Sequence, residues 1–102
     1  MKLWLDDIRP APDDGWKAVT SWRDAIRFLS TGWVEEVSLD HDLGSDRDGY
    51  QVASFIEESA CFDRIPRLKW NVHSMNPVGR ERITRCLERA DLFWEEHGIV
   101  AS

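Results

Sequence analysis

The chain is short and acidic, and its size, composition and charge exclude several classes of protein. Its 102 residues are enough for one hydrophobic core, and 42% of them are hydrophobic. The net charge of −6 argues against general binding of double-stranded nucleic acid, which calls for a basic face, but it is compatible with a small phosphate ligand. No apolar run approaches the length of a membrane span, and an apparent strand begins at the N-terminus. We therefore expect one domain over residues 1–102, in the cytoplasm, with no membrane partner.

Four short apolar segments are typical of β-strands. They cover residues 2–5, 16–20, 36–39 and 67–72. The first connection, residues 6–15, contains Pro10, Pro12 and Gly15, which exclude a helix there. This connection is short for a crossover between parallel strands. The second strand could therefore be antiparallel to the first or an irregular edge, instead of parallel to it.

Three helices are predicted from capping residues and apolar stripes. The first follows the N-cap Ser21 and stops at Gly32. The second covers residues 49–60, and the third covers residues 77–98 with Pro77 at the favoured first position. Strands that alternate with helices indicate an α/β fold, and we expect a mostly parallel four-stranded sheet with helices on both faces.

Four aspartates follow two of the predicted strands. Asp6 and Asp7 come after the first strand, and Asp40 and Asp42 come after the third. Ligands of open α/β sheets bind outside the carboxyl ends of the strands, and gathered like charges are costly unless a cation compensates them. Oxygen ligands favour Mg²⁺, Mn²⁺ or Ca²⁺, while neighbouring histidines also admit Fe²⁺ or Zn²⁺. The sequence predicts a divalent cation here, with Mg²⁺ or Mn²⁺ preferred; the alternative is that some of these aspartates cap turns.

Two histidines lie at predicted strand ends. His41 lies between Asp40 and Asp42, which favour its protonated form, and His73 ends the fourth strand. Two imidazoles beside one crevice suit a general acid and a general base acting on a phosphoester. Asp40, His41 and His73 are therefore the predicted catalytic residues. A structural role for each histidine is the alternative.

The start of the third helix is typical of an anion-binding site. A helix start offers free backbone N–H groups, and hydroxyl, amide and guanidinium donors are near it in the sequence. The predicted phosphate-binding residues are Arg9, Ser74, Asn76, Gly79 and Arg80. Arg9 could instead neutralise Asp6 or Asp7, and Ser74 or Asn76 could simply cap the helix.

Three motifs together resemble the cyclic-phosphate-processing receiver-like domains, a divergent branch of the response-regulator receiver fold. They are LDDIRP at residues 5–10, SLDHDLG at 38–44 and HSMNPVG at 73–79. The resemblance implies a three-layer flavodoxin-like fold, truncated relative to an ordinary receiver. The pattern lacks two elements of an ordinary receiver, the helix after the first strand and the fifth strand. It also lacks the lysine that follows the fifth strand, since no lysine occurs beyond Lys69. The resemblance also implies a role for each acid. Asp6 and Asp7 match the acid pair that binds Mg²⁺ in receivers, and Asp40 matches the aspartate that accepts the phosphate. Ser74 matches the hydroxyl that receivers carry after the fourth strand.

These observations favour a phosphoesterase-like domain. It would bind and process a cyclic phosphate of a nucleotide, an RNA end or an ADP-ribose derivative, and the corresponding enzyme is a metal-dependent cyclic phosphodiesterase. The predicted ligands of its cation are Asp6, Asp7, Asp40 and Asp42. Two alternatives stay open: a signalling or partner-docking receiver phosphorylated on Asp40, and a non-catalytic module that binds a cyclic nucleotide.

Overall fold

A four-stranded parallel sheet forms the centre of the computed structural model, which describes residues 1–40 and 49–101. The strands are β1 (Lys2–Leu5), β2 (Trp16–Val19), β3 (Glu36–Leu39) and β4 (Lys69–Val72), in the spatial order β2-β1-β3-β4. Every neighbouring pair is parallel. The second strand is therefore parallel to the first, although residues 6–15, all of them described, connect the two without a helix.

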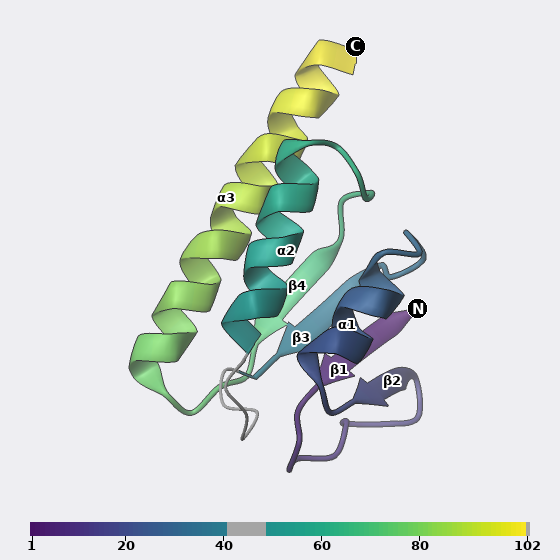
Figure 1. Cartoon of the computed structure of the whole chain (residues 1–102), viewed down its shortest axis with the longest axis vertical. Coiled ribbons are helices and arrows are strands. Elements are labelled where there is room, and N and C mark those ends of the chain that lie inside the picture. Colours follow the sequence, from purple (N-terminus) through teal and green to yellow (C-terminus); the bar gives the residue numbers. More distant parts are fainter. Residues whose placement is uncertain (41–48, 102) are drawn as a thin grey trace.

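The helices are α1 (Trp22–Leu29), α2 (Gly49–Cys61) and α3 (Pro77–Ala101). They form one layer, in which α1 packs beside α2 and α2 beside α3, in front of the sheet in Figure 1. The α/β class and the parallel sheet are as predicted, but the expectation of helices on both faces is wrong. Parallel crossovers are right-handed, so the connections from β2 to β3 and from β3 to β4, which step in the same direction, share a face. Only the helix-free connection from β1 to β2 steps the other way.

The core lies between the sheet and the helical layer. Strand side chains alternate between the two faces, so Leu3 and Leu5 of β1 join the helical core while Trp4 lies on the opposite face. The buried residues of α2 and α3 in this core are Val52, Ala53, Ile56, Ala60, Ile83, Cys86, Leu87, Ala90 and Trp94. Among the described residues, none of the helices has the length and apolarity needed to cross a bilayer.

The first connection covers the face of the sheet that the helices leave open. Trp4 is only 8% exposed there. Its Nε1 donates a hydrogen bond to the backbone oxygen of Arg9 at 3.0 Å, and its ring packs edge-to-face with that of Trp16. The ring of His73 stacks on the same indole, with 3.9 Å between the ring centroids. A loop and three aromatic rings thus replace the helix that the sequence lacks.

Candidate functional site

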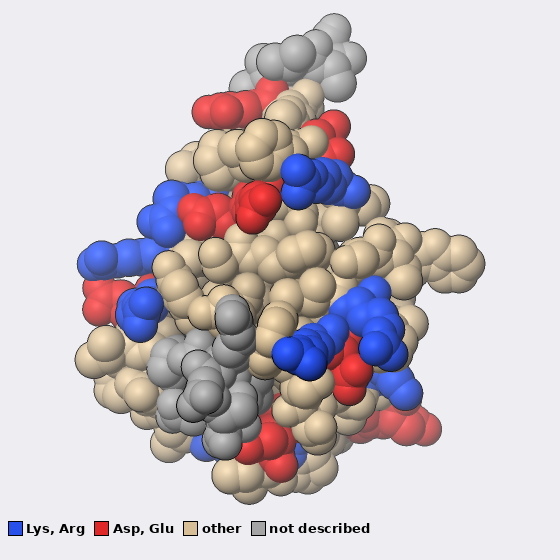
Figure 2. Space-filling model, in the orientation of Figure 1, with Lys and Arg blue, Asp and Glu red and all other residues tan. Residues whose placement is uncertain are grey.

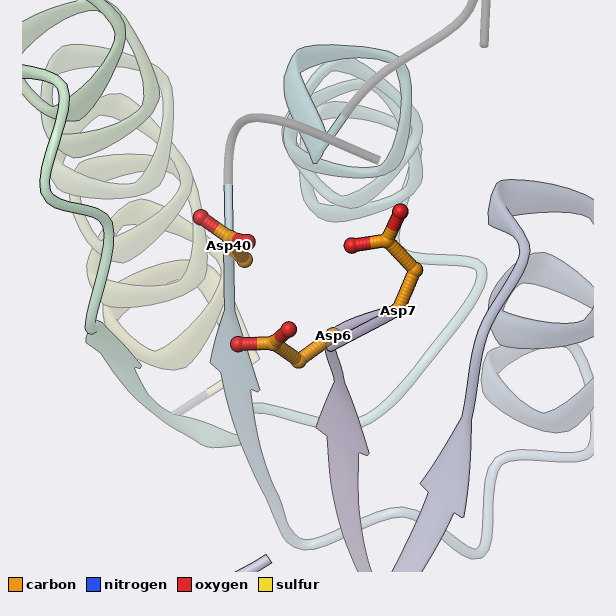
Figure 3. A group of neighbouring side chains, drawn as sticks. All are labelled: Asp6, Asp7 and Asp40. Carbon is orange, nitrogen blue, oxygen red and sulfur yellow. The ribbon is translucent and has the colours of Figure 1, made fainter. Parts of the chain in front are cut away.

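Three of the four predicted aspartates meet at the carboxyl edge of the sheet. Asp6 and Asp7 follow β1, and Asp40 follows the neighbouring strand β3 (Figure 3). One carboxylate oxygen from each lies within 4.8 Å of the others. Asp6 and Asp40 are 4% and 9% exposed, whereas Asp7 faces solvent. The other two predicted residues of this segment, His41 and Asp42, lie outside the described residues.

Asp6 is held from both of its carboxylate oxygens. Its Oδ1 accepts hydrogen bonds from the backbone N–H groups of Ile8 and Arg9, both at 2.8 Å, and its Oδ2 lies 3.0 Å from Nε2 of His73. Burial acts to raise the pKa of Asp6, but these hydrogen bonds outweigh it and hold the pKa below the ordinary 3.8. Asp6 therefore stays ionised, and a carboxylate with about four lone-pair sites keeps one for a further ligand.

His73 is fixed by two residues that sequence reasoning did not single out. Its Nδ1 lies 2.7 Å from the hydroxyl of Ser38, and its ring stacks on Trp4 with an interplanar angle of 4°. Burial lowers the pKa of His73 below the ordinary 6.5, although the charges of Asp6 and Asp40 act to raise it. In the sequence, the one signal for Ser38 is a serine between apolar residues of a strand. In the structure, Ser38 of β3 lies directly opposite Trp4 of β1, so both side chains are beside the ring of His73.

We expect the lowered pKa of His73 to appear in the pH dependence of stability. Without added cation, the free energy of unfolding should fall as the pH decreases below 6.5, because the unfolded chain gains a proton that the folded ring resists. This slope is at most about 1.4 kcal/mol per pH unit and ends once the pH passes the folded pKa. Urea unfolding of the wild type and His73→Gln between pH 7.5 and 5 measures it. Equal slopes in the two proteins would contradict the prediction.

The first turn of α2 lies directly against Asp40. A Cβ atom added to Gly49, the first residue of α2, would lie 1.9 Å from the backbone oxygen of Asp40, so only glycine allows this approach. The N-terminal end of a helix carries partial positive charge, which stabilises nearby carboxylates. The helix start thus offsets part of the repulsion among the acids.

The start of α3 is an N-capped helix. Asn76 Oδ1 accepts hydrogen bonds from the N–H groups of Val78 and Gly79, both at 3.1 Å, and the buried Ser74 hydroxyl accepts one from the N–H of Asn76 at 3.2 Å. The capping alternative therefore describes this segment, and three N–H groups at this helix start already have partners. Phosphate binding by Ser74, Asn76 and Gly79 stays a prediction.

The two predicted phosphate-binding arginines lie on different elements, Arg9 on the loop after β1 and Arg80 on α3. Arg9 donates from Nη1 to the backbone oxygen of His73 at 3.0 Å, which joins the first loop to the end of β4. Arg80 lines a groove of about 570 Å³ along α3, together with Ser74 and Met75. Arg9 thus contacts Asp6 through its backbone N–H and the end of β4 through its guanidinium, whereas Arg80 lies on α3 in a groove that none of the three carboxylates lines.

A comparison with protein families decides the affiliation of the chain. A family model described as the cyclic-phosphate processing receiver domain matches residues 1–89, which include all four strands, α1, α2 and half of α3. The chain belongs to this family. No curated protein and no solved structure matches it. The predicted resemblance and the truncated receiver-like fold are confirmed, and the described residues of this cyclic-phosphate processing receiver domain form no fifth strand.

The acidic edge of this receiver domain has the chemistry that a hard divalent cation requires. The three grouped side chains, Asp6, Asp7 and Asp40, offer only carboxylate oxygens, which suit Mg²⁺, Mn²⁺ or Ca²⁺. The hydrogen bonds to Asp6 orient one of these groups in advance, as the outer partners of metal ligands do in proteins. The described residues therefore fit such a cation, and Asp42 stays a predicted fourth ligand.

Proposed function

We propose that this cyclic-phosphate processing receiver domain holds a divalent cation with Asp6, Asp7 and Asp40 and uses the site to hydrolyse a cyclic phosphate. The observation that carries the proposal is the group of three carboxylates, whose ligand atoms lie within 4.8 Å of one another at the ends of two adjacent strands. The family supports the cyclic phosphate as the class of ligand.

The proposed reaction adds water to the phosphorus and opens the ring. A P–O bond forms to the oxygen of water, one ring P–O bond breaks, and the proton lost by water ends on the leaving alkoxide oxygen. A cation in the site would neutralise the phosphate and lower the pKa of a bound water. The chain contributes ionised carboxylates and the positive charge of Arg9, and His41 stays the predicted proton-transfer group from the sequence.

A small ligand suits the surface better than a long nucleic-acid strand. On the face shown in Figure 2, basic and acidic side chains lie beside one another over α2 and α3. The groove of about 570 Å³ along α3 has room for a nucleoside, and the exposed Met75 in its lining offers an apolar contact. A cyclic nucleotide, the end of an RNA or a cyclic-phosphate derivative of ADP-ribose all present this combination.

The direct test is turnover on a panel of cyclic phosphates. The protein is incubated with 2′,3′- and 3′,5′-cyclic nucleotides in Mg²⁺ or Mn²⁺, with EDTA controls, and products are followed by mass. A gain of 18 Da that requires the cation is the expected result. Binding of the nucleotide without any product, seen as a shift in melting temperature, would overturn hydrolysis and favour a non-catalytic binding module.

The position of Asp40 supports a second candidate function. Asp40 follows β3 beside the acid pair of β1, the place where ordinary receivers accept a phosphoryl group. A signalling domain would therefore be phosphorylated on Asp40. Incubation with acetyl phosphate and Mg²⁺ tests this function: a mass gain of about 80 Da, absent in Asp40→Asn, supports it. An unchanged mass contradicts it.

A further inference from the structure

We infer that His73 is a positioning residue for Asp6 rather than a proton-transfer group, and that Ser38 holds His73 in this role. The sequence predicted a general acid or base at His73. The inference rests on the proposed function for the cation that Asp6 would bind, but the orientation of the ring follows from the hydrogen bonds alone.

Both ring nitrogens of His73 are already engaged. An ionised carboxylate only accepts hydrogen bonds, so Nε2, which lies 3.0 Å from Oδ2 of Asp6, must carry a hydrogen. Nδ1 lies 2.7 Å from the hydroxyl of Ser38, which is 1% exposed and therefore has no access to bulk water. In the neutral ring Nδ1 accepts from this hydroxyl, and in the charged ring it donates to it. Neither nitrogen is available to a water molecule or a substrate in either state.

The ring is also fixed by its surroundings. The indole of Trp4 covers one face of His73 and is itself held by a hydrogen bond to the backbone of Arg9. The guanidinium of Arg9 bonds the backbone oxygen of His73 at 3.0 Å. A ring that is held at both nitrogens, on one face and at its own backbone is suited to orientation, whereas a general base must reach the proton that it removes.

The consequence of this arrangement is a carboxylate oriented in advance. His73 holds Oδ2 of Asp6 while two backbone N–H groups hold Oδ1. Loss of such an outer partner lowers metal affinity by about 10- to 100-fold in metalloproteins. Ser38 acts one step further out, through the tautomer and angle of the imidazole.

Two substitutions at His73 distinguish orientation from proton transfer. The side-chain amide of glutamine can donate to Asp6 as Nε2 does, but it cannot exchange a proton near neutral pH. Mn²⁺ affinity, measured by calorimetry, should fall by about 10-fold or more in His73→Ala and return to within about threefold of the wild type in His73→Gln. His97→Gln is the matched control, because His97 bonds the end of α2 and lies outside the acidic edge. Wild-type Mn²⁺ affinity in His73→Ala would overturn the inference, as would loss of turnover in His73→Gln with its Mn²⁺ affinity intact.

Nitrogen NMR of the imidazole provides a test that needs no cation. A hydrogen on Nε2 of neutral His73, with Nδ1 as acceptor, is the expected tautomer, and the Nδ1 resonance should shift in Ser38→Ala. A neutral ring protonated at Nδ1 would overturn the inference. If the wild type bound no Mn²⁺, the proposed function would fail, and so would the role of Asp6 in holding a cation. The tautomer would still decide whether Asp6 and Ser38 fix the ring of His73.

Discussion

Asp40→Asn is expected to abolish cation-dependent turnover and to weaken Mn²⁺ binding by at least about tenfold, which corresponds to about 1.4 kcal/mol. An amide of the same shape replaces a carboxylate whose oxygen lies within 4.8 Å of those of Asp6 and Asp7. The substitution removes a ligand and also part of the repulsion that the acids exert on one another. We therefore expect the melting temperature without cation to stay the same or to rise. Calorimetry with Mn²⁺ and thermal unfolding in EDTA measure the two effects.

Asp63→Asn is the control for the change in net charge. Asp63 is exposed beyond the C-terminal end of α2, and its φ of 54° is one that asparagine adopts readily. This variant should bind Mn²⁺ and turn over substrate as the wild type does. Full Mn²⁺ affinity and turnover in Asp40→Asn would rule out the proposed metal site.

Gly49→Ala is expected to be the most destabilising single-methyl substitution in α2. Its Cβ would lie 1.9 Å from the backbone oxygen and 2.9 Å from the carbonyl carbon of Asp40, and 3.3 Å from Cδ1 of Ile83. Overpacking in protein cores costs about 1–3 kcal/mol, and here the atoms in the way belong to a backbone that cannot rotate aside. Relief requires α2 to move away from the end of β3. Because Asp40 lies at that point, Mn²⁺ affinity should fall together with the urea midpoint.

Gly98→Ala is the matched control for this substitution. Gly98 also lies in a helix, but no described heavy atom beyond its chain neighbours and the backbone of its own helical turns comes within 4 Å of a Cβ added there. Alanine should stabilise the helix at this position by up to about 1 kcal/mol, because it loses less backbone entropy than glycine. Opposite signs for the two variants are expected. Equal stability of Gly49→Ala and the wild type would show that α2 does not approach Asp40 this closely.

The sequence is informative where residue patterns locate the ends of strands and helices. Asp6, Asp7 and Asp40 were predicted to meet because parallel strands end at the same edge, and the described residues bring them together. The strand and helix starts were predicted closely, although α3 continues to Ala101 rather than residue 98.

The remaining features depend on the relative placement of distant segments. Ser38 and His73 are 35 positions apart, so their hydrogen bond follows only from the register of β3 and β4. The sequence alone also does not show which face of the sheet each helix covers. The right-handed crossover rule assigns a face to a helix only once the order of the strands is known. Asn76 was ambiguous for a different reason, because the same amide suits a helix cap and a phosphate.

In this domain the helix-free connection at residues 6–15 both covers the sheet and carries part of the acidic cluster. In a fold with helices on both faces, one segment shields the sheet and another carries the reactive groups, so each tolerates change independently. Here a single stretch of chain provides two of the three grouped carboxylates, Asp6 and Asp7, anchors the ends of two strands and shelters Trp4. Insertions into this stretch should therefore be tolerated far less than surface loops usually allow. The segment that covers this face of the sheet also carries Asp6 and Asp7 of the acidic cluster.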